Sequence, residues 1–221
     1  MRTNTEYKNA ALAALKGNWA PAVLATVILV LLALLFTVPG EFIDRLTTNP
    51  GIILGFTGVS MVYMYLFLVP LQYIGYYNSL RLLYENGDDS IIHNMFSLTF
   101  KNYWHHVWVC FLMVLKIFLW TLLFIIPGII KALQYSMTPY IAVEHPELSA
   151  SEAIAMSRRM TKGHLFDIFW LGLSFIGWFL LGILTLFIGY LWLEPYMYTT
   201  FAAFYCDLKA EYLVGESGSG A

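Results

Sequence analysis

The long apolar runs of this chain constrain its fold more than any other feature. The longest of these runs cover residues 19–38, 52–76, 104–126 and 165–192. A helix rises ~1.5 Å per residue, so ~20 residues cross the ~30 Å of hydrocarbon in a bilayer. Only helices and closed barrels satisfy their backbone in lipid, and a barrel would show short alternating segments. The sequence therefore predicts an all-α, polytopic membrane protein.

Composition supports this class and excludes one kind of partner. Of the 221 residues, 59% are hydrophobic and 12% are charged, whereas soluble domains carry about 25% charged residues. The formal net charge is -2, and there is no basic cluster of the kind that binds nucleic acid. Membrane lipids are the expected partners, and nucleic acid is not.

Two shorter apolar segments complete the pattern. They cover residues 129–143 and 195–205, and each follows a longer run. With outer turns at Pro39-Gly40 and Pro127-Gly128, the chain is predicted to form six transmembrane helices arranged as three helical hairpins. Whether the two short segments cross the membrane fully is left open by the sequence.

The basic residues predict the orientation. Most of the 12 lysines and arginines would lie on one side: Arg2, Lys8, Lys16, Arg81, Lys101, Arg158, Arg159, Lys162 and Lys209. Basic residues are enriched in cytoplasmic loops. We therefore expect a multi-pass protein of the bacterial cytoplasmic (inner) membrane with both termini in the cytoplasm.

A short amphipathic stretch precedes each long run. Thr3 with Glu6, and Ser149 with Glu152, have the spacing of a capping box. A third stretch, residues 91–101, follows the looser cap of residues 88–90. We expect three cytoplasmic helices that lie on the membrane.

These helices divide the chain into three unequal copies of one unit. Residues 1–214 would form a single six-span domain, with pseudo-repeats at about 3–86, 89–145 and 149–213. Residues 215–221, GESGSGA, have the composition of a flexible linker or tag remnant.

Each amphipathic stretch ends at a lysine and is followed by the next span. We interpret these positions as membrane-entry corners, where lysines meet lipid phosphates and indoles lie at the headgroup level. Gly17 and Gly163 would allow the chain to turn there. The corner residues are Lys16, Trp19, Lys101, Trp104 and Lys162.

Three charged residues are candidates for ligand binding because charge is costly inside a membrane. Lys116 falls near the middle of the third span, so it should face protein or water. Its side chain could contact a ligand headgroup or an ion. Alternatively, it is paired inside the protein or extends outward to the membrane interface. Lys131 and Glu194 flank the outer boundary, where they either pair or line the edge of a cavity. We expect Lys116→Met to reduce ligand binding.

Tyrosines crowd the returning spans, and Tyr135 and Tyr198 are further ligand-binding candidates. A buried tyrosine hydroxyl needs a partner, so an interior lined by these residues suits an amphiphile or lipid better than a bare ion. The alternative is that these side chains form interfacial belts and hydrogen bonds between helices.

No catalytic residue, metal site or cofactor is predicted. The chain contains no HExxH, GxSxG, P-loop or GxGxxG motif. His164 with Asp167 is the only neighbouring acid–base pair that an intramembrane enzyme could use.

Several segments resemble a known family. They are LKGNW, PGIIKA, ELSASEAIAMSRRMTKGH, LSFIGWFLLG and PYMYTTFAAFY. Together they are similar to the bacterial membrane family catalogued as domain of unknown function nine-seven-five, which is related to the membrane domain ahead of some glycerophosphodiester phosphodiesterases. The resemblance implies a six-span fold and phospholipid surroundings, and it implies no activity and no functional residues.

Two functions from different classes follow as hypotheses. The leading one is a non-enzymatic protein that binds or transports a lipid-like or amphiphilic molecule. The alternative is a scaffold or accessory subunit that docks a protein partner, or a second copy, through cytoplasmic helices such as SASEAIAMSRRMTKGH. An intramembrane enzyme is the least favoured of the three.

Overall fold

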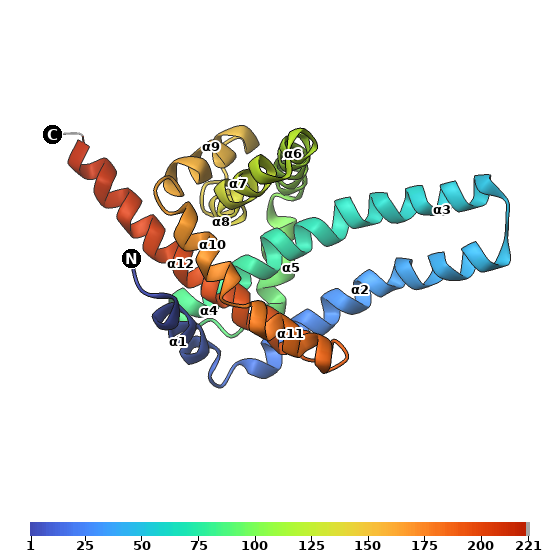
Figure 1. Cartoon of the computed structure of the whole chain (residues 1–221), viewed down its shortest axis with the longest axis horizontal. Helices are drawn as coiled ribbons and strands as arrows, with labels where there is room; N and C mark the ends of the chain where they lie inside the picture. Colours follow the sequence, from blue (N-terminus) through green and yellow to red (C-terminus); the bar gives the residue numbers. More distant parts are fainter. Residues whose placement is uncertain (220–221) are drawn as a thin grey trace.

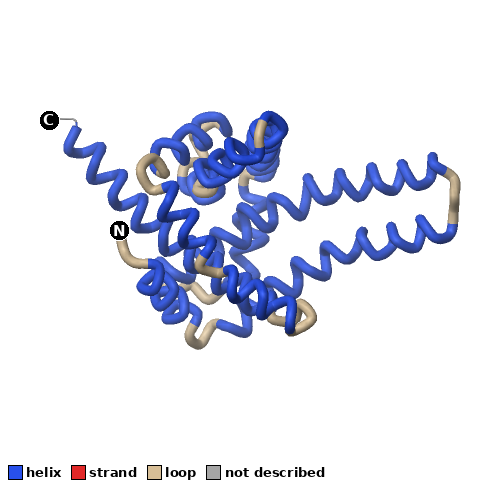
Figure 2. The backbone as a smooth tube through the Cα atoms, in the orientation of Figure 1, coloured by secondary structure: helices blue, strands red, loops and turns tan. Residues whose placement is uncertain are grey.

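The computed structural model describes the backbone of residues 1–219, and all side chains in that range except those of residues 36–44 and 215–219. All regular secondary structure in the described residues is helical (Figure 2). This confirms the predicted all-α class.

In chain order, and divided at the repeat boundaries, which remain a prediction, the helices form three groups. The first group is α1 (Asn4–Leu15), α2 (Trp19–Leu46), α3 (Pro50–Tyr63), the π-helices η1 (Met64–Leu68) and η2 (Leu71–Tyr76), and α4 (Tyr77–Asn86). The second is α5 (Ile91–Lys101), α6 (Tyr103–Leu123), α7 (Ile125–Tyr135) and α8 (Thr138–Glu144). The third is α9 (Ala150–Met160), α10 (Leu165–Leu173), α11 (Ile176–Leu184) and α12 (Tyr190–Ser219). In Figure 1, α2 and α3 lie side by side and project away from the remaining helices.

Three helical stretches of the described chain are long and apolar enough to cross a membrane. They are Pro50–Asn86, Tyr103–Leu123 and Leu165–Leu184. A fourth is counted if Asn4–Leu15 and Trp19–Leu35, which are bent by 96°, act as one span. The protein is thus an all-helical membrane protein, whereas six spans in three hairpins remain a prediction.

The first two turns do not lie where the proline–glycine pairs predicted them. Helix α2 continues past Pro39 and ends at Leu46, and Asn49 caps α3 by accepting a hydrogen bond from the Gly51 amide at 2.9 Å. Helix α6 ends at Leu123, and Pro127 lies in the first turn of α7. Proline is tolerated in a first turn, where the backbone N–H groups have no helical partner.

The short segments also differ from their predicted bounds. The predicted segment 129–143 is split into α7 and α8, because Pro139 starts a new helix. The predicted segment 165–192 is broken at residues 174–175 and ends at a turn over residues 185–189, where the Thr185 hydroxyl accepts a hydrogen bond from the Gly189 amide at 2.9 Å. Helix α12 then runs to Ser219, well beyond the predicted segment 195–205 and into the predicted linker.

Pro70 explains the two π-helices in the middle of the longest stretch. Proline has no backbone N–H and its ring collides with the carbonyl four residues earlier, which here belongs to Leu66. The chain widens into π-turns on both sides of Pro70, and the Tyr103 hydroxyl donates to the Leu66 carbonyl at 2.6 Å. A side chain of α6 thus replaces the missing backbone donor.

The three predicted amphipathic helices are α1, α5 and α9, and the capping boxes at Thr3 and Ser149 are both formed. Hydrogen bonds from the side chain and backbone of Ser149 lower the pKa of Glu152 from its ordinary 4.5. Each helix buries apolar residues against other helices: α1 against α12, α5 against η2 and α4, and α9 against α6 and α8. These buried faces therefore contact protein, and the position of the three helices on the membrane remains a prediction.

A glycine makes the closest of these contacts possible. A Cβ atom at Gly75 in η2 would lie 2.1 Å from the Met95 carbonyl oxygen and 2.3 Å from the Thr99 hydroxyl. Helix α5 therefore approaches the backbone of η2 directly.

At the predicted corners, Gly17 and Gly163 have φ values of +91° and +96°, a conformation that residues with a Cβ rarely adopt.

Candidate functional site

Five tyrosines line one pocket of about 240 Å³. They come from η2, α4, α7, α8 and α12: Tyr73, Tyr77, Tyr135, Tyr140 and Tyr198. The rest of the wall is mainly apolar and consists of Met113, Val114, Ile117, Ala132, Ser136, Met137, Pro139 and Phe201. We call this the tyrosine pocket.

Three hydroxyl groups of the tyrosine pocket lack a hydrogen-bond partner among the described residues. They belong to Tyr73, Tyr135 and Tyr140, and the last two side chains are only 6% and 2% exposed. None of the three hydroxyl oxygens is among the fully buried polar atoms that lack a partner, so each is accessible to another molecule. The pocket therefore offers hydrogen-bonding groups to a molecule that enters it.

The tyrosines form a stack that extends beyond the pocket. The ring centroids of Tyr77 and Tyr198 are 4.1 Å apart, and those of Tyr77 and Tyr140 are 6.4 Å apart. Tyr140 also stacks on Tyr205 of α12 at 4.7 Å. Because stacked aromatic rings hold one another in a fixed orientation, this column connects α4, α8 and α12.

A buried charge cluster lies at the end of the stack. The guanidinium of Arg81 donates to Glu144, and their side chains are 5% and 13% exposed. Glu144 also accepts hydrogen bonds from the Tyr205 hydroxyl at 2.7 Å and from Lys209 at 2.8 Å. The charges of Arg81 and Glu144 therefore compensate each other inside the protein, so neither is free to bind a charged ligand.

The structure brings two of the five predicted ligand residues together. Tyr135 and Tyr198 both line the tyrosine pocket, whereas Lys116, Lys131 and Glu194 do not. Successive residues of a helix point ~100° apart, so Lys116 lies to one side of the α6 face that carries Met113, Val114 and Ile117.

Lys131 and Glu194 do not form the predicted pair. Lys131 donates to Gln134 at 2.9 Å and lies 4.9 Å from the ring centre of Trp120. Glu194 is half-buried on α12, one turn before Tyr198.

The predicted corner residues lie at helix ends. Lys16, Lys101 and Lys162 are exposed, at the ends of α1, α5 and α9. Trp104 is 73% exposed, whereas Trp19 is half-buried and packs against the core. Their contact with lipid headgroups remains a prediction.

The acid–base pair has an additional partner. The Nδ1 atom of His164 lies 3.2 Å from a carboxylate oxygen of Asp167, and its Nε2 atom lies 3.1 Å from a carboxylate oxygen of Glu211. In the described part of the chain, no group of three or more His, Cys, Asp and Glu residues is arranged to hold a metal ion.

In the sequence, Arg81 indicated only the orientation of the chain, and Glu144 had no predicted role. These residues are 63 positions apart in the sequence, and no local motif links them. The only available signal was that Glu144 ends an apolar segment where the tyrosines are frequent.

These features define an all-helical membrane protein with a tyrosine-lined pocket. Residues 123–212 match a family described as "Protein of unknown function (DUF975)". The match covers α7 to most of α12, which is less than half of the chain, and it includes Tyr135, Tyr140 and Tyr198. No curated protein and no solved structure matches the chain.

Proposed function

We propose that this protein binds a lipid-like or amphiphilic molecule in the tyrosine pocket and that it acts without catalysis, as a binding or transport protein. The observation that carries the proposal is the set of three tyrosine hydroxyls without partners in a mainly apolar pocket. Apolar walls with a few placed polar groups are typical of small-molecule sites.

The size of the pocket favours part of an amphiphile rather than a whole one. A water molecule takes about 30 Å³ of liquid volume, so 240 Å³ corresponds to roughly eight waters. That volume accommodates a small headgroup, while a hydrocarbon chain would have to lie outside the tyrosine pocket.

The setting we propose is the bacterial inner membrane, with six spans in three hairpins and both termini in the cytoplasm. Exposed apolar side chains at the ends of two helix pairs support this arrangement. They include Leu122, Phe124 and Ile125 between α6 and α7, and Leu184, Leu186 and Phe187 between α11 and α12. The distribution of basic residues supports the orientation.

A scaffold is the second candidate. Arg158 and Arg159 on α9 are exposed, and neither forms an ion pair within the described residues. Adjacent unpaired arginines are suited to an acidic partner surface. Charge reversal at both positions would then abolish co-purification of a protein partner and leave ligand retention unchanged.

Filling the tyrosine pocket tests the leading proposal. Ala132 is exposed and lines the pocket, so Ala132→Trp places an indole there. We expect retention of the co-purifying amphiphile to fall about tenfold or more, because overpacking a filled site costs ~1–3 kcal/mol. Native mass spectrometry of the gently extracted protein, with identification of the bound lipid, measures this.

Two variants serve as controls. Ala20→Trp adds the same indole at another shallow apolar groove, lined by Trp19 and Trp192, and should leave retention unchanged. Lys116→Met should also leave it unchanged, because Lys116 does not line the pocket; this differs from the expectation based on sequence. Equal retention in the Ala132→Trp variant and the wild type would contradict the proposal.

A further inference from the structure

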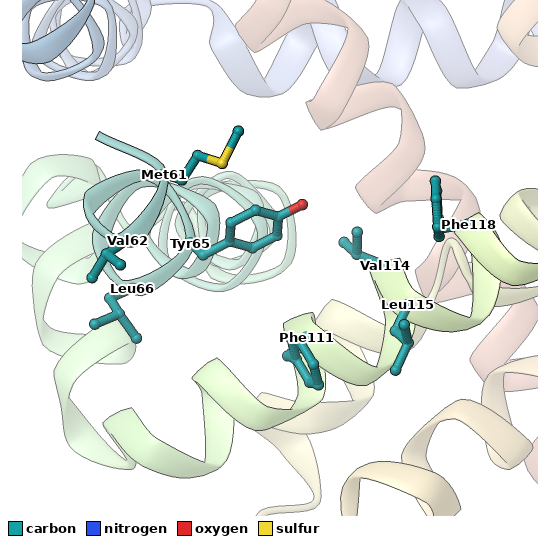
Figure 3. A pocket seen from close by; sticks show the side chains of 8 residues that line it. All are labelled: Met61, Val62, Tyr65, Leu66, Phe111, Val114, Leu115 and Phe118. Atoms are coloured by element: carbon teal, nitrogen blue, oxygen red, sulfur yellow. The ribbon is translucent and has the colours of Figure 1, made fainter. Parts of the chain in front are cut away.

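A larger apolar groove of about 500 Å³ lies between the α3–η1 stretch and α6. Figure 3 shows its lining: Met61, Val62, Tyr65, Leu66, Phe111, Val114, Leu115 and Phe118. Tyr65 extends from its helix toward α6 in this view. We call this the apolar groove.

The apolar groove adjoins the tyrosine pocket. Val114 of α6 lines both of them. Met113 and Ile117 face the pocket, and Phe111, Leu115 and Phe118 face the groove, so Val114 lies at the border between the two. On the other wall, one continuous helical stretch contributes Tyr65 to the groove and Tyr73 to the pocket. The two spaces therefore follow each other along the same pair of helices.

The chemistry of the combined space changes from one end to the other. The groove is lined by apolar side chains and a single tyrosine, whereas the pocket has five tyrosines. No described lining residue of either space is charged. Of the cations nearby, Arg81 binds Glu144, and Lys131 binds Gln134 and lies over Trp120. Lys116 and Arg158 form no ion pair among the described residues, but neither of them lines either space. A charged headgroup would therefore find no counter-charge in the walls of the two spaces, and burying a charge in that way is costly.

We propose that the tyrosine pocket and the apolar groove form one site for an amphiphile with an uncharged, hydrogen-bonding headgroup and a single long hydrocarbon chain. The headgroup binds the free hydroxyls of Tyr135 and Tyr140, and the chain lies between α3–η1 and α6. A methylene group takes about the volume of a water molecule, ~30 Å³, so the groove holds on the order of 15 methylenes. This inference rests on the proposed function and adds the class of ligand.

The test uses a monoacylglycerol with a photoreactive diazirine midway along its chain. The full-length protein in detergent micelles is irradiated with this probe, and the labelled residues are identified by mass spectrometry. We expect saturable labelling within residues 61–66 and 111–118. Excess 1-monooleoylglycerol should compete for it, and oleoyl lysophosphatidate, which has the same chain and a charged head, should compete at least about tenfold less well.

Two tryptophan variants of α6 provide a matched pair. Leu115→Trp fills the groove and should reduce its labelling about tenfold. Leu122→Trp adds the same side chain at a position that is 74% exposed and lines neither space, so labelling should be unchanged.

Each result distinguishes this inference from the proposed function. Saturable labelling that maps outside the groove but is abolished by Ala132→Trp would overturn the inference and leave the proposed function intact. Equal competition by the charged lipid would overturn the assignment of an uncharged headgroup. If no labelling is saturable, the inference is wrong, whereas the proposed function is tested separately by retention of the co-purifying amphiphile in native mass spectrometry.

Discussion

Replacing Glu144 with glutamine is expected to lower the free energy of unfolding by about 3–5 kcal/mol, the usual cost of breaking a buried ion pair. The substitution keeps the shape of the side chain but leaves the buried guanidinium of Arg81 without its carboxylate. Glu85, the other carboxylate near Arg81, is 4.0 Å away and lies at the limit of an ion pair. Denaturant unfolding of the protein in detergent micelles measures the loss.

A second substitution separates charge from packing. The double variant Arg81→Met with Glu144→Gln removes the unpaired charge, so it should recover at least half of the lost stability. Glu147→Gln is the control, because Glu147 pairs with His145 on the surface and is 65% exposed; its effect should stay within about 1 kcal/mol. Equal losses for Glu144→Gln and Glu147→Gln would show that the cluster does not stabilise the fold.

The second large effect is expected at Gly75. In a Gly75→Ala variant the new methyl group would lie 2.1 Å from the backbone oxygen of Met95, so α5 and η2 would have to separate. Backbone atoms cannot move aside as a flexible side chain can, and we therefore expect a loss of about 3 kcal/mol or more. Thermal unfolding in detergent micelles measures this change.

Gly55 and Gly58 in α3 provide the matched control. A Cβ at either position would meet nothing within 4 Å. Alanine is the better helix former by about 1 kcal/mol, so Gly55→Ala and Gly58→Ala should be neutral or stabilising. If Gly75→Ala were equally benign, the close contact between α5 and η2 would be wrong.

The fold class and several local features could be predicted because they depend on short-range chemistry. Apolar runs indicated membrane helices, and the spacing of Thr3 with Glu6 and of Ser149 with Glu152 indicated capping boxes. Both boxes are formed. Gly17 and Gly163 were recognised as turning points, and their positive φ values agree with this interpretation.

The turns were harder to predict because one signal fits two structures. A proline–glycine pair can close a helix, but proline is equally suited to a first helical turn. Pro127 takes the second of these roles, and α2 continues past Pro39. The turn at residues 185–189 contains no proline, so its signal in the sequence was weak.

The candidate site could be predicted only in part, because tertiary packing selects which residues meet. The sequence singled out Tyr135 and Tyr198, and both line the pocket; their binding of a ligand stays a prediction. The role of Tyr140 depends on how α8 packs between α4 and α12. Lys116 was singled out by its depth along the helix, but the direction in which it points depends on which face of α6 packs against the other helices.

The tyrosine pocket as a ligand site is the central claim, and removing its free hydroxyls tests that claim most directly. The triple variant Tyr73→Phe, Tyr135→Phe and Tyr140→Phe keeps the rings and deletes only the unpartnered groups. Native mass spectrometry should show that the wild type retains a selective amphiphile at a fixed stoichiometry and that the triple variant loses it, with no loss of thermal stability. Retention of the same amphiphile at the same stoichiometry by the triple variant would contradict the claim.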